Sequence, residues 1–131
     1  MKIQRFEDIL AWQKAQDFAV NVYEVFGNIK DFGFKDQILR AVVSISNNIA
    51  EGFNRSSDAD FVRFLYMALG SCSETRSMLY LAERLGYLSN KQKLSFIESS
   101  NEISKIIRGL IKSIIKKKLT IDFRLPTTDY Y

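Results

Sequence analysis

The sequence has no histidine, one cysteine (Cys72) and one proline (Pro126) among 131 residues. Without histidine the chain lacks the commonest general base and the commonest metal ligand, and a lone cysteine cannot form an internal disulfide. These absences weaken every interpretation of the chain as an enzyme. We therefore expect no enzymatic activity, no catalytic residues, no metal or other cofactor and no small-molecule substrate.

Long hydrophobic runs are also missing. No uncharged run exceeds about half of the ~20 apolar residues that a membrane-spanning helix needs. Glu7 and Asp8 stand where a signal peptide would have its apolar stretch. We expect a protein of the cytoplasm with no membrane partner.

Apolar residues recur at spacings of three and four along most of the chain, which is typical of amphipathic helices. The pattern defines four helical segments at about residues 7–27, 36–53, 57–85 and 89–118. The turns between them are short, so consecutive helices should run antiparallel and bury one apolar stripe each. The sequence thus predicts an all-α protein, an antiparallel up-and-down four-helix bundle formed by residues 1–118.

Capping signals mark several helix ends. Ser57 has the features of an N-cap, and Gly86 is well placed as the left-handed residue that follows a helix. Ser89 and Gln92 have the spacing of a capping box at the start of the fourth helix. Beyond residue 118, apolar and polar residues alternate, which predicts an extended C-terminal tail at residues 119–131. This tail would lie over the bundle or reach a neighbouring subunit.

The stretch SISNNIAEGFNR, at residues 44–55, is unusually polar for a bundle helix. On a helical wheel its polar residues form one stripe, opposite the apolar side. The stripe and two residues of the third segment form a predicted polar interface or network: Arg40, Ser44, Asn47, Asn48, Glu51, Arg55, Ser71 and Glu74. Three alternatives remain open: a solvated surface with pairs such as Glu51 with Arg55, a subunit interface or ring lumen, and a hydrogen-bond network between helices.

The basic residues gather near the C-terminus, where residues 100–131 carry the whole formal net charge of +4. Most of them lie on one side of the fourth helix or at its end, and we predict that they contact nucleic acid: Lys105, Arg108, Lys112, Lys116, Lys117 and Lys118. The alternative is a solvated face whose cations complement the helix dipole. No aromatic residues are interleaved with these cations, so stacking on bases is not expected.

Two small residues of the third segment also bear on its packing. Gly70 lies inside a helix, where glycine costs about 1 kcal/mol relative to alanine, so we expect another backbone to approach it closely. Cys72 has no candidate base beside it, and we expect it to be a buried apolar side chain rather than a nucleophile.

Four stretches of the sequence carry a family resemblance: FEDILAWQKAQDFAVNVY, QILRAVVSISNNIAEGFNR, FVRFLYMALGSCSET and LAERLGYL. Together they resemble the four-helix bundle family encoded in intervening sequences of bacterial 23S ribosomal RNA genes. The resemblance implies an up-and-down bundle that assembles into a homopentameric ring and has no established enzymatic activity. It also extends to the accessory protein of diversity-generating retroelements, which is associated with nucleic acid and a reverse transcriptase.

The expected function follows from the basic residues and the resemblance. We expect a non-enzymatic, oligomeric bundle protein, most simply a homopentamer, that binds structured RNA or a ribonucleoprotein partner. The alternative is a pure oligomeric scaffold with no role in nucleic-acid binding.

Overall fold

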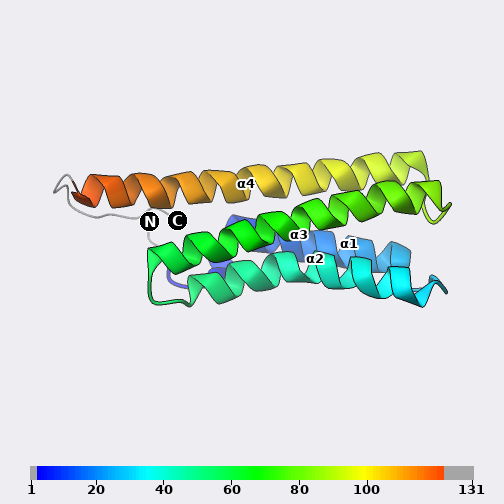
Figure 1. Ribbon diagram of the computed structural model, residues 1–131, viewed down its shortest axis with the longest axis horizontal. Helices are drawn as coiled ribbons and strands as arrows, with labels where there is room; N and C mark the ends of the chain where they lie inside the picture. Colours follow the sequence, from blue (N-terminus) through cyan, green and yellow to red (C-terminus); the bar gives the residue numbers. More distant parts are fainter. Residues whose placement is uncertain (1–2, 123–131) are drawn as a thin grey trace.

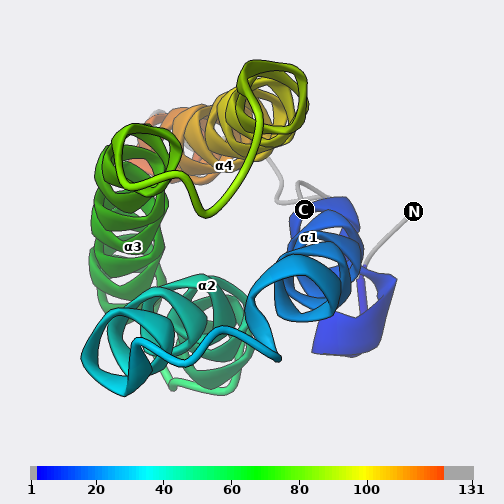
Figure 2. The ribbon, with the colours of Figure 1, turned by 90° about the vertical axis from the view of Figure 1, so that its right-hand side faces the viewer.

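The computed structural model describes residues 3–122, with side chains from residue 3 to residue 117, and every regular element in this range is helical. A short 3-10 helix precedes four α-helices; the elements are η1 (Phe6–Asp8), α1 (Leu10–Phe26), α2 (Phe32–Phe53), α3 (Asp58–Arg84) and α4 (Asn90–Asp122). Consecutive helices run in opposite directions, and α4 extends past the beginning of α3 (Figure 1). Viewed from one end, the helices stand around a common core in chain order (Figure 2). The predicted up-and-down four-helix bundle is confirmed.

Two helix starts differ from the predicted ones. Residues 7 and 8 belong to η1, so α1 begins at Leu10. The second helix begins at Phe32, about four residues before the predicted start, because the Asp31 carboxylate accepts a hydrogen bond of 3.2 Å from the Phe34 backbone N–H. Gly33, which precedes the predicted start at residue 36, lies in the first turn of this helix.

The other predicted caps are present. The Ser57 hydroxyl accepts from the Asp60 backbone N–H at 3.1 Å, and Gly86 has a φ of 79°, in the left-handed region. At the start of α4, Ser89 and Gln92 each accept from the backbone N–H of the other, at 3.1 and 2.9 Å. These reciprocal bonds satisfy backbone donors that the first turn of a helix leaves without intrahelical partners.

The end of α4 corrects part of the tail prediction. The helix continues to Asp122, so the first four residues of the predicted extended segment, 119–122, are helical. The remainder of that segment, residues 123–131, lies outside the described residues.

All four helices contribute to the core. Its largest fully buried side chains include Phe18, Val22, Phe26, Ile38, Ile45, Ile49, Phe61, Leu65, Leu79, Ile103, Ile107 and Ile114. As predicted, Cys72 is buried, and this burial raises the pKa of its thiol. Over the described residues, no helix combines the length and the apolarity that crossing a membrane requires.

The glycine at which two helices meet closely is Gly52, not Gly70. A Cβ atom on Gly52 would lie 2.5 Å from the Phe64 Cβ atom and 3.2 Å from the Phe61 ring, so α2 and α3 approach each other at this point. A Cβ atom on Gly70 would meet no other described element within 4 Å. The expectation that another backbone of this chain packs on Gly70 is therefore wrong.

Candidate functional site

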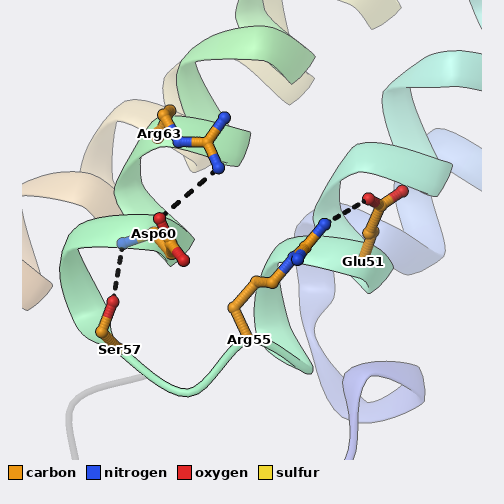
Figure 3. A network of polar contacts seen from close by, with 5 residues as sticks. All are labelled: Glu51, Arg55, Ser57, Asp60 and Arg63. Atoms are coloured by element: carbon orange, nitrogen blue, oxygen red, sulfur yellow. Dashed lines mark hydrogen bonds and ion pairs between the residues drawn. The ribbon is translucent and has the colours of Figure 1, made fainter.

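The polar stripe on α2 divides into separate groups, and the first of them lies at the turn between α2 and α3. The Arg55 guanidinium donates to the Glu51 carboxylate at 2.8 Å, and the two side chains are 44% and 57% exposed (Figure 3). Arg63 pairs with Asp60 at 3.4 Å. Arg55 and Arg63 both lie over the Phe64 ring, at 4.7 and 4.9 Å from its centroid. The pairing predicted for a solvated surface is therefore present at this end of the stripe.

The second group joins α2 to α3 through hydroxyl groups. Ser44 Oγ and Ser71 Oγ are hydrogen-bonded to each other, and each also lies within hydrogen-bonding distance of a carbonyl of its own helix. Asn48 Nδ2 donates to the Ser44 carbonyl at 2.8 Å, and the Thr75 hydroxyl donates to the Ser71 carbonyl at 2.8 Å. These four residues form the inter-helix network that was one of the three alternatives for the stripe.

The remaining stripe residues face solvent. Arg40 and Glu74 line an open depression of about 520 Å³ formed mainly by α2, and Ser44 of the hydroxyl network lines it as well. Asn47 is exposed as well. The eight predicted residues thus do not converge on one site.

Arg76 forms a polar junction that the sequence did not indicate. It lies on α3 close in sequence to Ser71 and Glu74, but it faces α4 instead of α2. Its guanidinium donates to Ser100 and Ser104 of α4 at 3.4 and 3.3 Å, and to Ser73 of its own helix at 3.1 Å. The sequence feature that could have indicated this contact is the series of serines in α4, of which Ser100 is fully buried.

Gln16 and Ser46 form a second missed contact. The Gln16 amide donates to the Ser46 hydroxyl at 2.9 Å and joins α1 to α2. Only 1% of Ser46 is exposed, because it lies on the side of α2 opposite the Ser44 network, against α1.

Two further contacts tie the loops at one end of the bundle. The Tyr87 hydroxyl donates to the Asp31 carboxylate at 2.6 Å, which lowers the pKa of Asp31 and raises that of Tyr87. Glu83 pairs with Lys93 at 2.9 Å, and hydrogen bonds from Lys93 and Asn90 lower the pKa of Glu83. Both carboxylates act as structural acceptors.

The basic residues of α4 form a row on its solvent side. Lys105, Arg108, Lys112 and Lys116 are exposed, whereas Lys117 is half-buried. Eleven helical rises separate Lys105 from Lys116, which makes the row about 16 Å long at 1.5 Å per residue. The side chain of Lys118 lies outside the described part of the chain.

The same side of α4 carries acidic residues nearer its beginning. Glu98 and Glu102 are exposed there, and Lys14 of α1 pairs with Glu102 at 3.3 Å. The solvent side of α4 therefore changes from acidic to basic at Lys105, which limits an anionic ligand to the second half of the helix.

No three histidine, cysteine, aspartate or glutamate side chains in residues 3–117 gather in the way that ligands of a metal ion would. The electrostatic feature that stands out is the cationic row of α4. The arrangement of polar groups is suited to recognition and to helix packing.

Comparison with known proteins identifies the family to which this bundle belongs. A model of the 23S rRNA-intervening sequence protein family matches residues 7–109. A solved structure of a protein of unknown function from the S23 ribosomal protein family of Bacteroides thetaiotaomicron is 34% identical, with a TM-score of 0.74, and the match covers 79% of this chain and 99% of that chain. No curated protein matches the sequence. The family model spans most of the chain, from η1 into α4, and the chain therefore belongs to the 23S rRNA-intervening sequence protein family.

Proposed function

We propose that this protein is a non-enzymatic, cytoplasmic helical-bundle protein that binds structured RNA, free or within a ribonucleoprotein, through the basic side of α4. The observation that supports the proposal most directly is the row of exposed cations from Lys105 to Lys112. A row of this kind attracts phosphates without reading bases, because base recognition in RNA uses splayed bases and stacking aromatic side chains. The bound RNA would be recognised by its backbone and shape.

Salt dependence tests this proposal. Each neutralised phosphate releases counterions, so three to four contacts predict a slope of about −2 to −4 in log K against log [salt]. Binding to an RNA hairpin and binding to a second hairpin of the same shape but unrelated sequence should show the same slope. The double variant Lys105→Ala with Lys112→Ala should weaken binding to both and reduce the slope by about 2.

Lys91 provides the matched control, since it is an exposed lysine at the opposite end of α4. Lys91→Ala should leave the slope almost unchanged. Absence of binding at low salt, or equal losses in the control and the double variant, would refute RNA binding through this row.

The proposal includes self-association into a closed ring, a homopentamer as the family resemblance implies. The exposed apolar side chains support it, because five of the large ones lie on one helix or its C-cap: Tyr66, Met67, Tyr80, Leu81 and Leu85. The same observation favours the second candidate function, an oligomeric scaffold with no RNA role. Light scattering after size exclusion measures the assembly, and a 15.2 kDa species at micromolar concentration would exclude the ring.

A further inference from the structure

Arg76 is a half-buried cation at the boundary where α3 packs along α4 (Figure 1). Within the described part of the chain it pairs with no carboxylate. Its hydrogen-bond partners are neutral hydroxyl groups, those of Ser73, Ser100 and Ser104. Moving a charge partly out of water is unfavourable unless an opposite charge or full hydrogen bonding compensates for it. Hydroxyl oxygens carry only partial charges, so an anion at this boundary would be stabilised.

Arg108 lies on the same flank of α4 as these serines. It follows Ser104 by four residues, which places it one turn further along and about 40° away around the helix. The bond from Arg76 to Ser104 shows that this flank faces α3, whereas Glu102 pairs with Lys14 on the flank that faces α1. Arg108 is exposed, and among the described residues it has no carboxylate partner either. Two guanidinium groups without a counter-ion therefore border this boundary.

The buried thiol of Cys72 indicates that the two charges lie close to one point. Burial raises the pKa of this thiol, whereas a hydrogen bond with Ser104 and the positive charges of Arg76 and Arg108 act to lower it. Distant charges are screened by water and salt, so a group responds mainly to charges in its surroundings. Both arginines thus lie near the place where Cys72 of α3 meets α4.

The acidic side chains nearest in sequence are directed elsewhere. Glu74 lines the depression on the α2 side of α3, and Glu83 pairs with Lys93. Glu102 is held by α1, and Glu98 is ten residues, or about 15 Å, before the α4 arginine. An anion could therefore bind both arginines without displacing a carboxylate of the described chain.

The available donors suit a phosphate group. A guanidinium group has five N–H donors in a planar fork that matches phosphate oxygens, and a hydroxyl group can accept from arginine while donating its own proton to an oxyanion. We propose that Arg76 and Arg108, with the hydroxyl groups of Ser73 and Ser104, bind one phosphate group at the boundary between α3 and α4. Ser100 is fully buried and holds Arg76 in place.

This inference rests on the proposed RNA binding and deepens it, because it adds a contact from α3 to the cationic row of α4. A phosphate group can belong to an RNA backbone or be free in solution. The two sources share the same chemistry at the site, and separate measurements with RNA and with inorganic phosphate distinguish them.

Binding of an RNA hairpin over a salt series is the first measurement. Arg76→Gln and Arg108→Ala should each weaken binding, and the double variant should reduce the slope of log K against log [salt] by about 1, since one phosphate contact is lost. Two independent contacts would reduce the slope by about 2. An unchanged slope, or a reduction by about 2, would overturn the shared site even where the lysines of α4 still bind RNA.

Arg84→Ala is the matched control, because Arg84 is exposed on α3, eight residues or about 12 Å beyond Arg76. It should leave both affinity and slope unchanged. Far-ultraviolet circular dichroism checks the fold of every variant, and the exposed position of Arg108 allows its substitution without loss of packing.

Thermal unfolding in inorganic phosphate at constant ionic strength is the second measurement. A free phosphate ligand should raise the Tm of wild type and Arg84→Ala to a plateau. Arg76→Lys keeps the charge but loses the planar fork, and it should lose most of this rise, as should Arg108→Ala. Phosphate also stabilises proteins in general through exclusion from their surfaces, which would raise the Tm of all variants alike.

The two measurements separate this inference from the proposed function. A specific rise in Tm without RNA binding would identify free phosphate as the ligand and refute RNA binding alone. Equal rises in all variants, with the expected change in the RNA salt slope, would assign the site to the RNA backbone. Equal rises together with RNA binding that does not depend on either arginine would refute the site and leave the proposed function intact.

Discussion

The close approach of α2 and α3 at Gly52 can be tested by adding a single methyl group. In Gly52→Ala the new Cβ atom would lie 2.5 Å from the Phe64 Cβ atom, well inside van der Waals contact. That atom is next to the α3 backbone, so relief requires the two helices to separate rather than one side chain to turn. Overpacking of this kind costs about 1–3 kcal/mol, against a gain in helix propensity of at most about 1 kcal/mol. We expect a net loss of about 1–2 kcal/mol in the free energy of unfolding.

Gly109→Ala is the matched control for this prediction. Gly109 is also inside a helix, but it is exposed and a Cβ atom there would meet no described atom outside its own helix within 4 Å. The same methyl group should therefore stabilise the fold by about 0.5–1 kcal/mol. Urea unfolding followed by circular dichroism at a fixed protein concentration measures both variants. If Gly52→Ala were as stable as Gly109→Ala, the close contact between α2 and α3 would be refuted.

Two further predictions concern polar contacts. Hydrogen bonds from the Tyr87 hydroxyl and the Phe34 N–H lower the pKa of Asp31 in the folded protein. The stability that the ionised Asp31 carboxylate gives the fold is therefore complete above its unfolded pKa of about 3.9, and it is lost as the pH falls through the lower folded pKa. Tyr87→Phe should therefore lose less stability than wild type between about pH 5 and pH 2 in acid-unfolding titrations, and identical profiles would contradict the assignment. Glu51→Ala removes an exposed i,i+4 pair and should change the free energy of unfolding by less than about 0.5 kcal/mol, whereas a loss above 2 kcal/mol would show that the pair is buried in an assembly.

The helices could be predicted from the sequence because their signals are local. Periodicity of three and four places apolar residues on one side, and the caps at Ser57 and Ser89 mark helix starts through bonds that span only three residues. The missed start of α2 has a local reason as well. Gly33 suggested a loop, but the Asp31 cap and the packing of Phe34 against Phe26 and Tyr87 favour a helix there.

The wrong expectation for Gly70 has a different cause. A glycine inside a helix indicates that something about the position is unusual, but the sequence does not say which neighbour, if any, approaches it. The sequence does not single out Gly52, because it lies near the end of α2, where glycine is common owing to the left-handed backbone conformation that often ends a helix. Only the crossing of α2 and α3 identifies it as the packing glycine.

The polar stripe shows the same limit for a whole surface. A helical wheel predicts which residues of α2 share a side, but not which part of that side meets another helix. Within the stripe, Ser44 bonds to Ser71 of α3, 27 residues away, whereas Glu51 pairs with Arg55, four residues further along the chain, and stays exposed. One side of a helix can therefore hold both a contact with a neighbouring helix and an exposed ion pair. The residues of the stripe share one side of α2 but make different contacts. Because they do not form one site, the exposed row on α4 is the stronger candidate for binding.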